Sequence, residues 1–174
     1  LAVALAASAG VDSEQITRWL LSPTLTLPIA LAVIAFAALV TPLTVAMQAV
    51  ACRLMGRVSA GVMSRWSPDY VRVWLKTGLV DAGGRWLYGT LFWPTWLRVA
   101  GMKVGRGCEI SGLIDTVPEM VEIGAGTFCA DGIYLAGPRV HRGTVAIAAV
   151  KLGQNTFLGN GVVIAGGQQL SDNI

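Results

Sequence analysis

The first third of the chain is dominated by apolar side chains and carries no charge between Trp19 and Cys52. After residue 27 the polar side chains in this run are Thr41, Thr44 and Gln48. About 20 consecutive apolar residues suffice for a helix to cross a bilayer core. The pattern therefore predicts a transmembrane helix over 27–52, with Pro28 in its first turn and a kink at Pro42. A buried helix of a soluble core is the alternative, but a chain of 174 residues has too small a core to hide this segment.

A second apolar segment, Leu1–Ala9, is about half as long as a membrane span. It has neither the basic leader nor the cleavage motif of a signal peptide. We therefore expect it to be the truncated end of another membrane helix in a larger polypeptide. Asp12, with Gln15 three residues later, predicts the N-cap of a short helix over 12–21. Residues 1–63 are thus predicted to form the membrane part of the chain.

Basic residues are distributed unequally on the two sides of the predicted span. Arg53, Arg57 and Arg65 follow it, whereas Arg18 alone precedes it. Because loops rich in Lys and Arg stay in the cytoplasm, we expect everything after residue 53 to be cytoplasmic. The span is then integral to the cell (inner) membrane, with lipid as its partner.

Five of the six tryptophans lie between Trp66 and Trp96, mixed with basic residues. Such a mixture suits the headgroup layer of a membrane, so residues 64–103 are predicted to form an interfacial helical connector. The same rings would also suit packing between the membrane helices and the domain that follows. The pattern does not separate these interpretations, and both can hold.

The connector is predicted to contain two helices. Ser67-Pro68-Asp69 has the order of an N-cap, a first-turn proline and an acid that the helix dipole favours, and Gly83-Gly84 is expected to end this helix. Its apolar face is expected to consist of Tyr70, Val71, Trp74 and Leu75. Arg72 and Lys76 are expected on the opposite side. Pro94 to Gly101 predicts a second, shorter helix.

Residues 104–174 repeat every six positions. An apolar residue opens each of nine hexads, and the next residue is always Gly, Ala or Ser. The opening residues are Val104, Ile110, Ile123, Cys129, Leu135, Leu152, Leu158, Ile164 and Leu170. The fourth position is Gly, Asn or Pro in eight of the nine. Neither a helix nor an alternating strand produces this period.

A six-residue period predicts a parallel β-helix. Each short strand points one aliphatic side chain inward, a tight turn follows, and three such faces make a coil on which the next coil stacks. The transmembrane α-helices are therefore expected to be followed by such a β-helix over 104–174. Residues 137–150 interrupt the period and are expected to protrude as a loop insert.

Composition agrees with a membrane protein. Hydrophobic residues make up 54% of the chain and charged residues 13%, where an average soluble domain has about a quarter charged. Residues 53–106 hold nine basic residues against two acidic ones, which is typical of a membrane surface. No nucleic-acid-binding motif accompanies them, so no nucleic-acid partner is expected. Three cysteines and one histidine provide neither a disulfide framework nor a metal site.

Two segments resemble a known family. Pro94–Gly105 (PTWLRVAGMKVG) looks like the entry into the first coil of hexapeptide-repeat acyltransferases. Thr156–Asn160 (TFLGN), together with the membrane helices, resembles the C-terminal membrane domain of nonribosomal-peptide-synthetase-like enzymes of the poly-lysine synthetase type. The resemblance covers residues 64–174 and implies that the β-helix is left-handed.

The resemblance also implies an activity and partners. The domain would take an acyl group from a pantetheine thioester, on a carrier protein or coenzyme A, and pass it to an amine or a hydroxyl. Carrier and adenylation domains of a larger polypeptide would be its partners. No cofactor would be bound by the chain itself, because the donor brings the pantetheine. A homo-oligomer is compatible with the same features.

Acyl transfer needs a base that deprotonates the acceptor. His141, the single histidine, lies in the insert between Arg139 and Arg142. In related hexapeptide acyltransferases the base is commonly a loop histidine, so His141 is predicted as the catalytic base. Arg139, Arg142 and Lys151 are predicted to contact a pantetheine phosphate. The alternative is a solvated loop with ordinary surface side chains.

Two further candidates lie at expected turns. Asp131 could orient the histidine or bind an amine, and Asn160 is a second candidate for the substrate. Both residues precede a glycine, so both also suit a purely structural role in a turn.

Three functions are compatible with these features. The first is a membrane-bound acyltransferase or condensation domain that works after a carrier domain. The second is a non-catalytic module that anchors a synthetase to the membrane and mediates its assembly. The third is a stand-alone sugar O-acetyltransferase that uses acetyl-coenzyme A.

Overall fold

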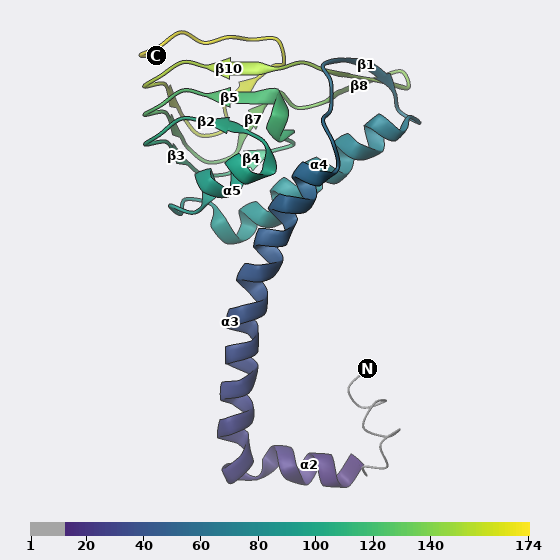
Figure 1. Cartoon of the computed structure of the whole chain (residues 1–174), viewed down its shortest axis with the longest axis vertical. Helices are drawn as coiled ribbons and strands as arrows, with labels where there is room; N and C mark the ends of the chain where they lie inside the picture. The colour runs from purple at the N-terminus through teal and green to yellow at the C-terminus, as the bar shows by residue number, and fades with distance from the viewer. Residues whose placement is uncertain (1–12) are drawn as a thin grey trace. The chain divides into compact units, whose positions relative to one another are not determined.

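The computed structural model describes residues 13–174, so the apolar segment Leu1–Ala9 and the N-cap Asp12 lie outside the described residues. The chain divides into two compact units, Leu1–Thr44 and Val45–Ile174. Helix α3 (Pro23–Leu54) runs through both. Figure 1 shows the order of the elements.

The first unit contains α2 (Ser13–Leu21) and the N-terminal part of α3. Within residues 13–174, Leu27–Leu54 of α3 is the one segment long and apolar enough to cross a membrane, with a mean hydropathy of 2.4. Only 6% of its most apolar window is buried, whereas a core helix of a soluble protein would be mostly buried. The helix begins at Pro23, so Pro28 lies in its second turn rather than in its first.

Three parallel sheets form most of the second unit (Figure 1). The first contains β2 (Lys103–Val104), β5 (Val121–Ile123) and β10 (Val150–Leu152). The second contains β3 (Glu109–Ile110), β6 (Phe128–Cys129) and β11 (Phe157–Leu158). The third contains β4 (Leu113–Ile114), β7 (Ile133–Leu135) and β12 (Val163–Ile164). A short 3₁₀ turn, η1 (Pro118–Met120), precedes β5. Each pass of the chain therefore contributes one strand to each sheet, and three passes stack on one another.

The interior of these sheets is aliphatic. Ile110, Cys129 and Leu158 lie in register on neighbouring strands of the second sheet, and all three are buried. Ile123 and Leu152 are aligned and buried in the same way in the first sheet. Full burial of one such side chain stabilises the fold by about 1.5–3 kcal/mol. A continuous column of these side chains is therefore the core of the coils.

Small residues at two positions of the six-residue period have different physical causes. At Gly105, Gly124 and Gly153, a Cβ would come within 2.4 Å of the backbone of the next pass, so close stacking excludes a side chain. At the fourth position the backbone is left-handed instead, which favours Gly and Asn. The residues with positive φ there are Gly107, Gly126, Gly132, Asn155, Gly161, Gly167 and Asn173.

The insert at 137–150 contains a β-hairpin, where sequence analysis expects a protruding loop. β8 (Arg139–His141) and β9 (Thr144–Ile147) pair in antiparallel fashion around Arg142 and Gly143, both of which have positive φ. Positive φ at both turn residues matches the right-handed twist of the two strands that a two-residue turn joins. β9 also pairs with β1 (Gly61–Ser64), which makes a three-stranded sheet in the order β1-β9-β8. The partner strand lies about eighty residues away in sequence, so no local pattern reveals it.

Helix α4 (Pro68–Leu87) begins as predicted, because the Ser67 hydroxyl caps its first turn. The prediction that it ends at Gly83-Gly84 is wrong. A Cβ on Gly83 would meet the ring of Trp96 at 2.6 Å, and one on Gly84 would meet the ring of Tyr88 at 2.0 Å. The two glycines therefore make room for aromatic rings inside a continuing helix. Helix α5 (Trp93–Ala100) ends at a left-handed Gly101, as predicted.

The packing of α4 differs from the expectation, because the side that carries Lys76 is the buried one. Val71, Trp74 and Leu75 are exposed, whereas Lys76 is only 2% exposed. The Lys76 ammonium forms an ion pair with Glu119 and donates to the Gly56 carbonyl at 2.6 Å. The same Glu119 oxygen accepts from the Val58 amide at 2.8 Å. A partner 43 residues away thus turns the opposite face of the helix inward.

The connector tryptophans divide into two groups. Trp93 and Trp96 are buried and stacked, with ring centroids 5.0 Å apart. The Trp93 indole donates to the Ser111 carbonyl at 3.0 Å, and the Trp96 indole donates to the Val45 carbonyl of α3 at 2.7 Å. The other three, Trp66, Trp74 and Trp86, are exposed. Packing therefore accounts for two of the five rings and leaves three for another role.

Replacing the buried lysine tests the ion pair. Lys76→Met leaves the Glu119 charge buried without its cation, so we expect it to lower the free energy of unfolding by about 3–5 kcal/mol. Lys103→Met removes an exposed pair with Glu122 and should cost about 0–1 kcal/mol. Denaturant unfolding of the full chain in detergent measures both. Equal losses in the two variants would contradict the assignment.

A charge in the aliphatic column tests the coil core. Leu158→Asp places a carboxylate beside Cys129, and we expect a penalty of several kcal/mol, seen as loss of protease resistance. Phe157→Asp changes the neighbouring residue on the same strand, whose side chain is exposed, and should leave protease resistance near that of the wild type. Unchanged resistance in Leu158→Asp would refute the inward orientation of Leu158.

Candidate functional site

His141 lies on the outward face of the hairpin sheet. It pairs with Thr144 on β9, and Arg139 pairs with Ala146. Alternate residues of a strand share one face, so His141 and Arg139 project to the same side. The opposite face carries Val145 and Ile147, which are buried. The imidazole and the guanidinium are therefore exposed together.

The segment that follows α3 holds this hairpin in place. β1 pairs along the whole of β9, and the Arg65 amide donates to the Gly143 carbonyl at 2.9 Å. The Thr144 hydroxyl closes the turn by donating to the His141 carbonyl at 2.7 Å. The Arg65 guanidinium lies over the Trp66 ring, 5.8 Å from its centre. Arg65 thus joins the turn residue Arg142 at the basic tip of the hairpin.

Lys151 lies elsewhere, on the outward face of the first parallel sheet. Its ammonium is 3.3 Å from the Glu122 carboxylate, and the Lys103 ammonium is 3.2 Å from the same group. The three residues form one row across β2, β5 and β10. Hydrogen bonds from Lys103 and then Lys151 lower the pKa of Glu122 from its ordinary value. Lys151 is therefore engaged by an internal anion.

A groove of about 350 Å³ runs beside this row. Its lining includes Lys103, Glu119, Glu122, Lys151 and Gln168, so it carries both signs of charge. A ligand with both an anionic and a cationic group would match this lining better than a simple anion.

Asp131 and Asn160 occupy one corner of the stacked coils. The Asp131 carboxylate accepts from the Gly112 amide at 3.1 Å and from the Ser111 hydroxyl at 3.4 Å. The Asn160 side-chain oxygen accepts from the Asp131 amide at 3.0 Å. Each side chain thus bonds to the pass below it, which is a structural use of both residues.

The predicted site residues consequently occupy three places: the hairpin, the first sheet and a corner. Among residues 13–174, no hydrogen bond or ion pair joins His141, Arg139 or Arg142 to the other three candidates. Arg139, His141 and Arg142 form the one group that the structure brings together. No set of three or more His, Cys, Asp or Glu in the same range is placed to hold a metal ion.

A second groove, of about 580 Å³, was not foreseen from the sequence. It is mostly apolar and is lined by Leu91, Pro94 and Arg98 on one side and by residues of β3 and β6, including Glu109 and Phe128, on the other. Phe128 stacks on Phe157 with ring centroids 5.3 Å apart. The Cys129 thiol also lines it, but burial raises its pKa to about 12, which does not suit Cys129 to the role of a thiolate nucleophile.

Two titratable residues beside the third sheet were also missed. Burial, followed by the charge of Asp115, raises the pKa of Asp81 on α4. Burial raises the pKa of Tyr88 to about 12, and its hydroxyl donates to the Leu113 carbonyl at 3.1 Å. A carboxyl with a raised pKa is a candidate acid or base. In the sequence, Asp81 is one charge on a helix and carries no distinguishing signal.

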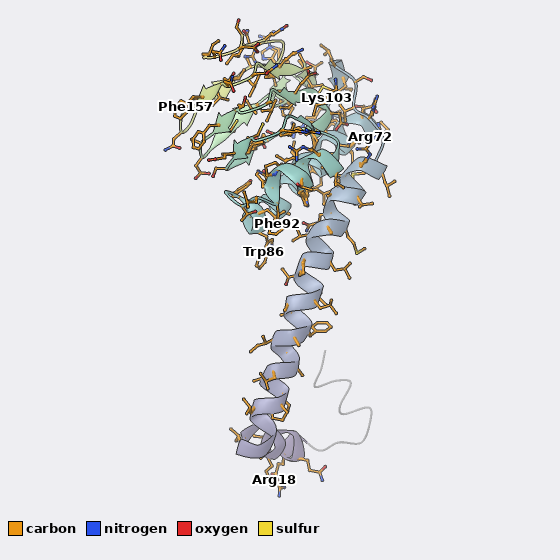
Figure 2. All side chains as sticks on the ribbon, turned by 60° about the vertical axis from the view of Figure 1, so that its left-hand side comes forward. Arg18, Arg72, Trp86, Phe92, Lys103 and Phe157 are labelled. Carbon is orange, nitrogen blue, oxygen red and sulfur yellow. The ribbon has the colours of Figure 1, made fainter. Side chains whose placement is uncertain are left out.

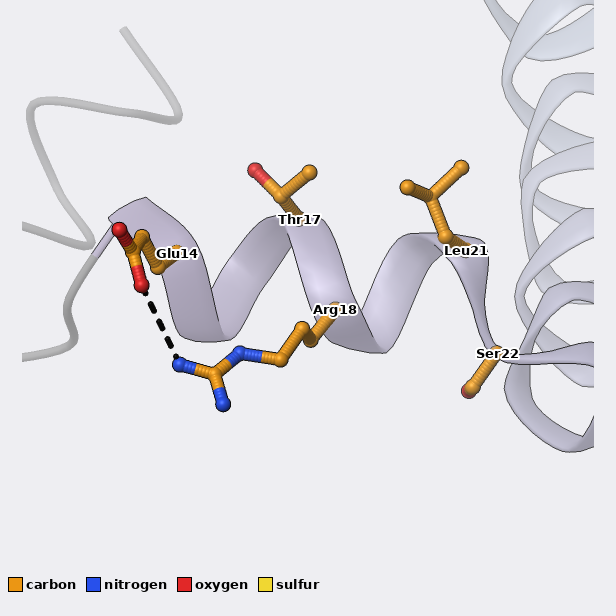
Figure 3. Close-up of a pocket in the computed structure, with 5 residues that line it drawn as sticks. All are labelled: Glu14, Thr17, Arg18, Leu21 and Ser22. Atoms are coloured by element: carbon orange, nitrogen blue, oxygen red, sulfur yellow. Dashed lines mark hydrogen bonds and ion pairs between the residues drawn. The ribbon is translucent and has the colours of Figure 1, made fainter.

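In the first unit, a cavity of about 440 Å³ lies against α2. Figure 3 shows Glu14 and Arg18, whose ion pair spans 3.3 Å, with Thr17, Leu21 and Ser22 completing the lining. The pair is exposed and joins neighbouring turns of one helix. It stabilises α2 modestly.

Comparison with known proteins identifies a relative. No protein-family model matches the chain, and no solved structure matches it. The delta-poly-L-ornithine synthetase of Acinetobacter baumannii (strain AB307-0294) is 33% identical over 121 residues, which are 68% of this chain. This chain is a distant homologue of a poly-amino-acid synthetase. It spans only 9% of the length of that curated relative.

The engagement of Lys151 can be tested by titration. Lys151→Met removes one hydrogen bond that favours the charged form, so the pKa of Glu122 should rise. Lys103→Met should raise it further, because the Lys103 bond is the larger cause. Carboxyl carbon NMR shifts across the acid range measure both. The pKa of Glu122 is lower in the folded protein than its ordinary value. Its bonds to Lys103 and Lys151 therefore stabilise the fold above the ordinary pKa, and this contribution is lost as the pH falls through the folded pKa. An unchanged pKa in Lys151→Met would mean that Lys151 is free to bind a substrate.

Proposed function

We propose that this chain is a membrane-bound acyltransferase or condensation module of a poly-amino-acid synthetase. The homology to delta-poly-L-ornithine synthetase carries the proposal, because the name of that relative describes the joining of amino acids into a polymer. Carrier and adenylation domains of a larger polypeptide would supply the activated donor. The stacked coils would be a left-handed β-helix.

In the proposed reaction, an acceptor amine attacks the carbonyl carbon of an acyl-pantetheine thioester. A C–N bond forms and the C–S bond breaks, so an amide and a free pantetheine thiol result. His141 takes the proton from the attacking amine and returns it to the departing sulfur. A neutral imidazole suits this task because its ordinary pKa is close to neutral pH.

The basic tip of the hairpin supports the binding of the donor. Arg139 and Arg142 flank the histidine, and the backbone of Arg65 holds the turn. A guanidinium binds a phosphate through two parallel hydrogen bonds, so these side chains suit the phosphate of the pantetheine arm. Lys151 is a weaker candidate for this role because its ammonium already forms an ion pair with Glu122.

The proposed location follows from α3 and the residues after it. A span over Leu27–Leu54 with Arg53 in its last turn, and with Arg57 and Arg65 after it, would place the second unit in the cytoplasm, on the inner face of the cell membrane. A carrier domain loaded in the cytoplasm could then reach the hairpin.

A non-catalytic role in anchoring and assembly is the second candidate. It is favoured by one observation: His141 is exposed on an open sheet face, while the grooves of about 350 Å³ and 580 Å³ in the second unit are lined by other residues. The two functions predict different results for substitution of the histidine.

Substitution of His141 in the full synthetase tests the catalytic proposal. His141→Ala should lower amide formation by about 10²–10⁴-fold, which is the usual contribution of one positioned base. Val140→Ala, on the same strand but on the opposite face, is the matched control and should keep the wild-type rate. Thermal stability should barely change in either, because both side chains are exposed. A wild-type rate in His141→Ala would support the anchoring module instead.

Labelling in intact cells tests the proposed orientation. Gln168→Cys places an exposed thiol on the second unit, while the three native cysteines are buried and give little background. A membrane-impermeant thiol reagent should label it only after the cells are opened. Labelling in intact cells would place the unit outside.

A further inference from the structure

An exposed apolar surface on the second unit has no role in the proposed transfer. On α4, Val71, Trp74, Leu75 and Trp86 recur at helical spacing and are all exposed. Leu91 and Phe92, just after the helix, are 92% and 72% exposed. Figure 2 shows Trp86 and Phe92 at the same edge of this unit. We name Trp86, Leu91 and Phe92 the apolar edge. Apolar surface of this kind marks an interaction site in most proteins.

The length of α3 indicates what meets this edge. The apolar segment Leu27–Leu54 has 28 residues. At 1.5 Å per residue it is about 42 Å long, whereas a bilayer hydrocarbon core is about 30 Å thick. With the hydrocarbon core starting at Leu27, about eight residues at the end of the segment extend into the headgroup layer.

Those last turns of α3 belong to the second unit and are packed against α5. Val45, Ala49 and Cys52 are buried there, and the Trp96 indole donates to the Val45 carbonyl. Val45 comes two residues before the last eight, so we expect α5 to lie at the boundary between the hydrocarbon core and the headgroup layer. Leu91 and Phe92 immediately precede α5, so they lie at the same end of the unit.

The composition of the edge agrees with that depth. Tryptophan rings prefer the boundary between headgroups and acyl chains, and basic side chains nearby bind lipid phosphates. Arg85 is an exposed basic residue of α4 and is adjacent to Trp86 in sequence. An apolar surface could equally bind a protein partner. Binding to a protein would not, however, require this surface to adjoin the end of a membrane span.

We propose that the apolar edge docks into the headgroup layer of the membrane that α3 crosses, so that the second unit rests on the bilayer surface. The mostly apolar groove beside β3 and β6 would then open at that surface, because Leu91 lines it. The docking does not depend on acyl transfer, and its test needs no activity.

A depth measurement on the full chain in lipid vesicles tests the docking. An environment-sensitive fluorophore is attached to Phe92→Cys or, as the matched control, to Phe157→Cys, whose parent side chain is 63% exposed on β11. The vesicles contain anionic phospholipid with nitroxide labels near the headgroup. At residue 92 we expect a blue-shifted emission that lipid nitroxides quench and aqueous iodide does not. At residue 157 we expect the reverse.

Three results would overturn the proposal. Iodide quenching at both positions would show that the edge is in water. If neither quencher reduces the emission of the label at residue 92 when each vesicle holds at most one chain, the chain covers its own apolar edge. The same protection appearing only at high protein density would show that a second copy covers it. To exclude a local effect of the label, Trp86→Cys should give the same pattern as Phe92→Cys.

Discussion

The buried ion pair between Lys76 and Glu119 is the interaction on which the arrangement of the second unit depends. It joins α4 to the turn before β5, and it also binds the Gly56 carbonyl and the Val58 amide in the segment that leaves α3. Loss of either charge would leave the other buried and unpaired, which proteins tolerate poorly. One contact thus fixes three segments: the residues that follow α3, helix α4 and the coils.

The position of the hairpin follows from this contact. β1 begins three residues after Val58 and supplies the strand that pairs with β9, so the site of His141 depends on the segment that the ion pair anchors. The outward rows of the first and second parallel sheets differ in chemistry. The first is charged, with Lys103, Glu122 and Lys151, and the second is aromatic, with Phe128 on Phe157. Each face is therefore suited to a different kind of contact.

Sequence analysis succeeded where the determining contacts are local or periodic. The uncharged run after Trp19, the Ser67 cap and the left-handed Gly101 are local signals, and each corresponds to an observed element. It failed where a distant partner decides. Lys76 was placed on the exposed side because nothing near it in sequence points to Glu119, and the insert was expected as a loop because β1 lies far upstream.

The candidate site shows the same limit. Arg139, His141 and Arg142 were grouped by adjacency, and a hairpin keeps neighbours together. Lys151 was added by residue type, and Asp131 and Asn160 by their places at expected turns. Partners in other passes of the coil bind all three, and no pattern near them in sequence reveals these partners. The handedness of the coils and the transfer reaction remain proposals that rest on resemblance and homology.

The most direct test of the account is to follow the acyl-loaded carrier domain of the full synthetase by intact-protein mass spectrometry. The account predicts that adding a free amine acceptor discharges the thioester and yields the amide product at the same rate. In a synthetase that lacks residues 104–174 of this chain, the loaded carrier should accumulate and no product should form. Product formation at an unchanged rate without these residues would contradict a catalytic role and leave the chain as a membrane anchor.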